Sequence, residues 1–235
     1  MRIDVVTAFP SIVTGPLEKS MIGRAMKQRL VEIRIHDLRS WTKDKHRTID
    51  DTPYGGGAGM IYKIEPLYDC LTDLTGNGGD EMKIILTSPR GAGFSQAKAV
   101  KLSLLAHIII ICGHYKGVDE RIKEFFPVEE ISIGDFVLSG GEIPALLMID
   151  AVVRLIPGVL GDMESAFSDS FSDGLLDCDY YTRPESFRKV KVPNILLSGD
   201  HKKIDTWRHQ RREEITRINR PDLYKKYLKE NKNKK

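Results

Sequence analysis

The stretch Ala106-His107-Ile108-Ile109-Ile110-Ile111-Cys112 holds four isoleucines in succession. β-Branched residues favour strands, and a strand that is apolar on both faces is typical of a parallel sheet with helices packed on each side. The stretch therefore predicts a short, fully buried strand. The apolar run from Leu104 to Cys112, which His107 interrupts, is far shorter than the roughly 20 residues that a membrane helix needs.

Strand and helix patterns alternate outward from this run. The expected strands are 3–8, 31–35, 82–87 and 106–112, and the expected helices are Pro16 to about Leu30, 96–104, 118–126 and 143–156. We place Pro16 at the first position of its helix, where proline is well tolerated. Strands that alternate with helices predict an α/β fold with a largely parallel sheet.

The pattern changes after Pro157, where Gly, Ser and Asp dominate up to about Asp177. Such a composition is typical of a loop. Beyond it, apolar residues at helical spacing predict one helix around 204–218 and another that begins at Pro221. We therefore expect a catalytic α/β domain over 1–157, a flexible interdomain linker over 158–177, and a small, mostly helical domain over 178–235.

Charge is divided unevenly along the chain. The net charge is +3, but residues 186–235 hold 16 Lys and Arg against 6 Asp and Glu, a net charge of +10, whereas residues 1–185 hold 20 against 27, a net charge of −7. A basic terminal module beside an acidic body indicates a polyanionic partner such as nucleic acid. A merely solvated basic face is the alternative.

Composition indicates a cytoplasmic, globular protein. Hydrophobic residues make up 41% and charged residues 29% of the chain, a balance typical of folded domains. The start Met1-Arg2-Ile3-Asp4 lacks the apolar core of a secretory signal. The three cysteines are far apart in the sequence and form no metal-binding or disulfide pattern, so we expect buried, reduced thiols.

Four glycine-rich stretches can hold a ligand: Gly55–Gly59, Gly113–Gly117, Ile133–Asp135 and Ser139–Glu142. The last three follow predicted strands, and ligands of parallel α/β proteins bind at the carboxyl ends of strands. Each loop taken alone can also be an ordinary turn. The chain has neither the GxxxxGK[ST] nor the strand-linked GxGxxG motif, and its histidines lack the spacing of a metal hydrolase.

Two charged residues stand out as candidates for chemistry. Arg154 follows a hydrophobic helix segment, so its permanent charge requires a nearby anion. Asp169 lies in the Ser/Gly-rich linker, where a carboxylate can close over a bound substrate. A structural salt bridge for Arg154 and a solvated loop position for Asp169 are the alternatives.

Motifs across nearly the whole chain resemble one family, the bacterial tRNA (guanine-N1) methyltransferases of the SPOUT class (the TrmD family). The matching segments are DKHRTIDD (44–51), PYGGG (53–57), GVDER (117–121), SIGDFVLSGGE (132–142), IPGVLG (156–161), DSF (169–171), GLLDC (174–178), YTRP (181–184) and LLSG (196–199). The resemblance implies a trefoil-knotted catalytic domain, an exception to the usual absence of knots. It also implies a homodimer whose active sites are shared between chains.

The resemblance further implies S-adenosylmethionine as the cofactor and tRNA as the substrate. The methyl group would go to N1 of the guanosine immediately 3′ of the anticodon, at position 37. The implied cofactor-binding residues are Leu86, Ser88, Pro89, Gly113, Tyr115, Gly117, Ile133, Gly134, Asp135, Phe136, Val137, Leu138, Gly140, Gly141 and Pro144.

The same resemblance gives Asp169 the role of general base and Arg154 that of its partner at the developing oxyanion. Two positions depart from the family: Lys116 and Ser168 stand where acidic residues are common. No metal site is predicted, and if a magnesium ion assists relatives, Lys116 puts its binding here in doubt.

For the basic terminal domain we expect tRNA contacts from Lys202, Lys203, Arg208, Arg211 and Arg212, with Arg217 on the same helical stretch. Trp207 can either stack on a base or pack beside Ile204. Two alternative functions stay open at this point: a non-catalytic RNA-binding protein, and a related SPOUT enzyme that methylates a ribose or another base.

Overall fold

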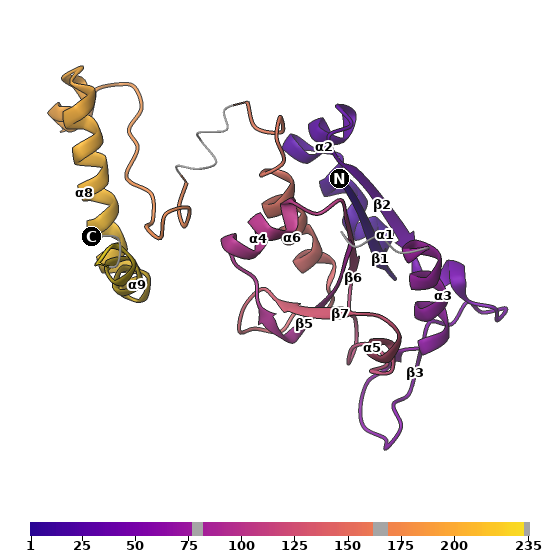
Figure 1. Ribbon diagram of the computed structural model, residues 1–235. Coiled ribbons are helices and arrows are strands. Elements are labelled where there is room, and N and C mark those ends of the chain that lie inside the picture. Colours follow the sequence, from indigo (N-terminus) through magenta and orange to yellow (C-terminus); the bar gives the residue numbers. More distant parts are fainter. Residues whose placement is uncertain (77–81, 162–168, 233–235) are drawn as a thin grey trace. The chain divides into compact units, whose positions relative to one another are not determined.

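The isoleucine-rich stretch forms β6 (His107–Ile111), the middle strand of a five-stranded sheet, in a computed structural model that describes residues 1–76, 82–161 and 169–232 (Figure 1). All four strand pairs are parallel, in the order β2-β1-β6-β5-β7. β1 (Arg2–Thr7) and β5 (Met82–Gly93) flank the middle strand. β2 (Glu32–Asp37) and β7 (Val128–Ser132) form the edges.

Helices cover both faces of this sheet, as the apolar run predicts. Ile108 and Ile110 lie in one core cluster with residues of α1 (Pro10–Leu17), α2 (Ser20–Lys27), α4 (Gln96–Ser103) and α6 (Glu142–Val153). Ile109 and Ile111 lie in the other cluster, with residues of α3 (Ile64–Thr75), α5 (Ile122–Phe125) and the 3₁₀ helix η1 (Leu38–Trp41). Alternate side chains of one strand thus anchor two layers of helices.

The chain divides into two compact units, Met1–Gly161 and Asp162–Lys235. The first unit contains the sheet and a small hairpin of β3 (Asp50–Asp51) and β4 (Ile61–Tyr62). The second contains the antiparallel pair β8 (Ser186–Phe187) and β9 (Val190–Lys191), the 3₁₀ helix η2 (Asn194–Leu197), and the helices α8 (His201–Asn219) and α9 (Pro221–Lys232).

Some local expectations were wrong. The helix expected from Pro16 begins instead at Pro10, with Pro16 inside α1, and a break before Ser20 separates α1 from α2. Of the helix expected over 118–126, only Ile122–Phe125 forms. The two small hairpins and α3 had no counterpart among the expected elements, and β7 was expected only as a strand without bounds before the stretch Ile133–Asp135. The strands of the hairpins carry too few residues for a period to be recognised.

The three cysteines are buried and free, as expected. In the ranges that the structure describes, no helix is long and apolar enough to cross a membrane.

The buried carboxylate of Asp4 ties three strands together. It accepts from histidines on both neighbouring strands: His36 Nε2 lies 2.7 Å from Oδ1, and His107 Nε2 lies 2.6 Å from Oδ2. Arg2 adds an ion pair. Burial by itself raises the pKa of Asp4, but the two histidines and Arg2 outweigh it and lower the pKa to about 2.

We expect Asp4→Asn to lower the free energy of unfolding at pH 7 by about 2 kcal/mol. A folded-state pKa below the ordinary value of 3.8 means that the carboxylate stabilises the fold above about pH 4 and loses this effect as the pH falls toward 2. Urea unfolding of both proteins at pH 7, 4 and 2.5 measures the difference. Equal losses of stability in wild type and variant between pH 4 and 2.5 would contradict this assignment.

Candidate active site

A cavity of about 290 Å³ opens where β6 and β7 end and β5 bends. β5 pairs regularly with β7 up to Thr87, and pairing resumes at Ala92, so the residues between them bulge out of the strand. The bulge carries Ser88, Pro89 and Arg90 into the cavity wall. Bulges commonly redirect side chains beside functional sites.

Contacts with β7 hold this bulge in place. Arg90 Nη2 lies 3.2 Å from a Glu130 carboxylate oxygen and also pairs with Glu120. Gly91 passes so close to β7 that a Cβ there would lie 2.4 Å from the carbonyl carbon of Glu130. Only glycine, which has no Cβ, fits this close to β7 without a shift of the main chain.

The cavity gathers almost every residue for which the family resemblance implies cofactor contact. Those that line it are Leu86, Ser88, Pro89, Gly113, Tyr115, Gly117, Ile133, Gly134, Phe136, Val137, Leu138, Gly140, Gly141 and Pro144. Asp135 is exposed and does not line the cavity. The family resemblance did not implicate Thr87, His114 and Ser139, which also line the cavity. His114 and Ser139 belong to glycine-rich stretches that were expected to hold a ligand, whereas Thr87 was marked only by its neighbours Leu86 and Ser88.

The floor of the cavity is main chain packed against main chain. The Gly141 amide donates to the Gly113 carbonyl over 2.7 Å, and the Gly113 amide donates to Thr87 Oγ1 over 3.1 Å. A Cβ at Gly141 would lie 1.8 Å from Thr87 Oγ1 and 2.7 Å from the Gly113 nitrogen. The loops after β6 and β7 therefore meet the end of β5 with no room for a side chain.

A buried carboxylate lies beneath this floor. Glu142, the first residue of α6, is 2% exposed, and its Oε1 accepts from the Thr7 hydroxyl over 2.7 Å. Burial, followed by the charge of Glu142, raises the pKa of the Tyr62 hydroxyl. The sequence placed Glu142 at the end of a stretch expected to hold a ligand but did not suggest its bond to Thr7, which is 135 positions away in the chain.

Aromatic rings line one side of the cavity. Tyr115 adopts a left-handed φ of +57°, and its ring meets that of His114 edge-on at 4.5 Å between centroids. Burial, followed by a hydrogen bond to Asp50, raises the pKa of Tyr115. His114 Nδ1 is buried and, among the atoms that the structure describes, has no hydrogen-bond partner.

The two residues expected to carry the chemistry lie in different units. Arg154 is the C-cap of α6 in the first unit, and Asp169 is the first described residue of the second unit; both are partly buried. Ser168 lies outside the described residues, as does the linker from 162 to 168. The described part of the expected linker, 169–177, contacts α8.

The expected RNA-binding cations all lie on α8 but differ in their surroundings. Lys202, Lys203 and Arg208 are exposed, with Lys203 close to Asp200 and Arg208 3.8 Å from Asp205. Arg211 pairs with Asp179 and Glu214, and Arg212 pairs with Asp173. Trp207 is partly buried, one turn after the buried Ile204.

Lys116, one of the two positions expected to depart from the family, lines the cavity. In the part of the chain that the structure describes, no group of three or more His, Cys, Asp or Glu side chains is placed to hold a metal ion.

The parallel sheet, with a cavity bounded by glycine-rich loops at its strand ends, places this protein in a structural class. It is a parallel α/β protein with a ligand-sized site at the carboxyl edge of the sheet. Comparison with known proteins then identifies the family. The family model described as "tRNA (Guanine-1)-methyltransferase TrmD" matches residues 1–226.

Similar proteins bear the same name. A tRNA (guanine-N(1)-)-methyltransferase of Geobacter sulfurreducens is 49% identical over 226 residues, which cover 96% of this chain and 92% of that protein. One from Bacillus cereus strain AH820 is 47% identical over 223 residues, covering 95% and 91%. The chain belongs to the TrmD family of tRNA (guanine-1)-methyltransferases, so the resemblance is confirmed. It is a methyltransferase, which excludes the alternative of a non-catalytic RNA-binding protein.

Proposed function

We propose that the enzyme transfers a methyl group from S-adenosylmethionine to N1 of the guanosine immediately 3′ of the anticodon, position 37, in tRNA. The observation that carries this proposal is the cavity of a TrmD-family chain, in which fourteen of the fifteen expected cofactor residues come together. A tRNA substrate implies the cytoplasm as the place of action.

The cavity suits a folded nucleoside cofactor. Apolar side chains such as Leu86, Ile133 and Pro144 offer surfaces for a purine ring. In the glycine-rich loops the main-chain amides and carbonyls are open to hydrogen bonds with the polar groups of such a ligand. The close-packed floor at Gly141 leaves the space above it for the ligand. When bound, S-adenosylmethionine supplies a methyl group that its positive sulfur has already activated.

The protein's own part is proton removal and charge stabilisation. Guanine N1 carries a proton and is a poor nucleophile, so attack on the methyl group requires a base, and Asp169 fills this role. As the proton leaves, negative charge spreads toward O6, where the guanidinium of Arg154 can donate two hydrogen bonds. Positioning of the two substrates supplies much of the remaining rate.

One experiment tests this function directly. The enzyme is incubated with labelled cofactor and unmodified tRNA, and the methyl group is located by nuclease digestion and mass spectrometry. Label at N1 of guanosine 37 supports the proposal. Label on a ribose or on another base would favour the related SPOUT activity instead.

The proposed organisation is a knotted catalytic domain over 1–157, a linker over 158–177 whose described part, 169–177, is bonded to α8, and a tRNA-binding domain over 178–235. The trefoil knot in this proposal rests on the family resemblance. After β7 the chain passes beside the loop after β6, where His114 and Gly140 form an isolated antiparallel bridge, and then enters α6, which packs in the core cluster of Ile108.

We also propose a homodimer, because apolar side chains of the first unit are left in solvent. On α6, outside the cavity lining, Ile143 is 55% and Leu147 45% exposed. A helix that is apolar on all sides is normally buried, and a second copy of this chain is the partner that the family resemblance implies.

Leu147→Glu should therefore convert the dimer into a monomer and lower methyl transfer at least tenfold, because a carboxylate would be buried at the contact. Light scattering should give twice 26.6 kDa for wild type and the single mass for the variant. Phe125→Glu, at an exposed apolar position on α5, is the control. A monomeric, fully active wild type would contradict the shared-site proposal.

For the basic domain we expect tRNA affinity to fall steeply with salt, with a log–log slope of roughly −0.7 to −0.9 per neutralised phosphate. Reversing the charge of the exposed Arg208 and Arg217 together should flatten that slope by about one unit for each phosphate that is no longer neutralised. Filter binding at several salt concentrations measures both. Lys27→Glu together with Lys101→Glu, at exposed positions on α2 and α4, makes the same change in net charge and is the control. An unchanged slope in the Arg208 and Arg217 double variant would mean that this face is only solvated.

A further inference from the structure

The segment that bears Asp169 is a compact loop rather than an open connection. The Phe171 amide donates to the Leu175 carbonyl over 2.8 Å, and the Asp177 amide donates to Ser170 Oγ over 2.9 Å. Leu175 is fully buried. These bonds close the chain on itself immediately after Asp169.

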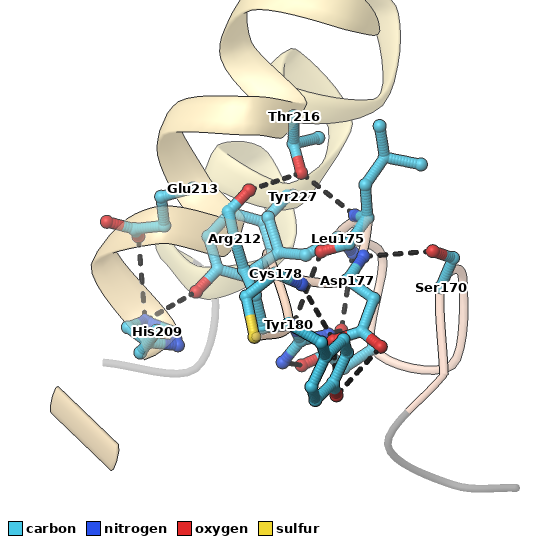
Figure 2. A network of polar contacts seen from close by, with 12 residues as sticks. Ser170, Leu175, Asp177, Cys178, Tyr180, His209, Arg212, Glu213, Thr216 and Tyr227 are labelled. Carbon is cyan, nitrogen blue, oxygen red and sulfur yellow. Dashed lines mark hydrogen bonds and ion pairs between the residues drawn. The ribbon is translucent and has the colours of Figure 1, made fainter. Parts of the chain in front are cut away.

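Two side chains of α8 hold this loop at Leu176, one at its amide and one at its carbonyl. Figure 2 shows Thr216 and Arg212 on the helix, with Leu175 and Asp177 on the loop beside them. Thr216 Oγ1 accepts from the Leu176 amide over 2.8 Å, while Arg212 Nε donates to the Leu176 carbonyl over 3.3 Å. The guanidinium of Arg212 also makes a two-pronged ion pair with Asp173, with Nη1 2.9 Å from Oδ2.

A hydrogen bond also links Thr216 to Arg212, so the two side chains hold the loop together. The Thr216 hydroxyl donates to the Arg212 carbonyl over 2.6 Å, so its oxygen is left to accept from the loop. Thr216 is fully buried, and the side chain of Arg212 is only 16% exposed. A buried hydrogen bond such as that between Thr216 and the Leu176 amide fixes main-chain position more firmly than an exposed ion pair does.

We propose that Arg212 and Thr216 are positioning residues for methyl transfer, which act by holding the loop that presents Asp169 to the substrate. This inference rests on the proposed role of Asp169 as general base. It also gives Arg212 a function other than the contact with tRNA phosphate that its charge suggests, because its guanidinium already holds Asp173 and Leu176.

The central test is Thr216→Val, which keeps the shape of the side chain and removes the acceptor of the Leu176 amide. We expect the single-turnover rate of methyl transfer to fall about 10- to 100-fold, with cofactor affinity unchanged, since the cavity lies in the other unit. Hydrogen exchange of 170–178 should accelerate. Thr216→Ser, which retains the hydroxyl, should restore the rate to within about threefold of wild type.

A matched control is available on the same helix. Thr206 bonds to the carbonyl of Lys202, four residues earlier, just as Thr216 bonds to Arg212, but Thr206 is exposed. Thr206→Val should change neither rate nor exchange. A rate for Thr216→Val equal to that of wild type would overturn the proposal.

Arg212→Lys separates positioning from phosphate binding and covers the case in which Thr216→Val fails to fold. Lysine keeps the charge but cannot pair with Asp173 and Leu176 together, so the rate should fall while tRNA affinity is retained. Asp173→Asn, at a half-exposed site, should reproduce the rate loss. If tRNA affinity falls and the single-turnover rate at saturating tRNA does not, Arg212 is a phosphate contact and the proposal is wrong.

Measuring Thr216→Val in an enzyme that already carries Asp169→Asn separates two outcomes: failure of the positioning role proposed for Thr216 and failure of the proposed methyl transfer. If the loop acts through Asp169, adding Thr216→Val to Asp169→Asn should cost little further rate. Equal losses in both backgrounds would show a general structural role and overturn the proposal. A wild type that does not methylate tRNA, or an Asp169→Asn variant at full rate, would instead refute the proposed function.

Discussion

Asp169→Asn should lower the rate of methyl transfer about 10²- to 10⁴-fold, the range typical of a lost general base. Asparagine has the size of aspartate but cannot take the proton from guanine N1. Because the cofactor cavity is built from residues 86–144 of the first unit, calorimetry should find the affinity for S-adenosylmethionine nearly unchanged. Loss of rate without loss of cofactor binding is the signature of a group that acts on the reacting atoms.

The control for this variant is Asp205→Asn, which removes a carboxylate from an exposed position on α8 and should leave the rate as it is. Arg154→Lys should also slow the reaction, since lysine keeps the charge but loses the planar pair of donors. Wild-type turnover in both Asp169→Asn and Arg154→Lys would refute the roles that we propose for these residues.

The sheet and its two helical layers were predictable because β6 carries its own signal. Four adjacent isoleucines suit a strand whose neighbours in sequence face opposite sides, and Ile108 and Ile109 indeed lie in separate core clusters. The cavity was predictable for a related reason: loops that follow parallel strands meet at one edge of the sheet. Residues 113–117 and 133–141 therefore had to come close together.

Polar contacts between distant parts of the chain could not be predicted. Thr7 and Glu142 bond across 135 positions, Asp4 and His107 across 103, and Asp173 and Arg212 across 39. Nothing in the local sequence marks such partners, because the pairing depends on how elements pack. Charge counting treated Arg211 and Arg212 as free cations for RNA, whereas both hold carboxylates of their own unit.

Gly141→Ala should weaken S-adenosylmethionine binding at least 100-fold, a cost of about 2.7 kcal/mol. The φ of Gly141 is −86°, so alanine is not opposed by the main-chain conformation. The penalty comes from contact: the added Cβ would lie 1.8 Å from Thr87 Oγ1 and 2.7 Å from the Gly113 nitrogen. The second neighbour is main chain, so relief requires the loop after β6 or the loop before α6 to move, and both loops line the space proposed for the cofactor.

Thr87→Ala combined with Gly141→Ala tests this reasoning. Removing the hydroxyl relieves the closest contact but not the one with the Gly113 nitrogen, so the double variant should recover only part of the affinity. Gly15→Ala in α1, where an added Cβ meets nothing within 4 Å, should bind cofactor like wild type, because alanine is well suited to a helix. Wild-type affinity in Gly141→Ala would mean that the floor yields easily and that its close packing does not shape the cofactor site.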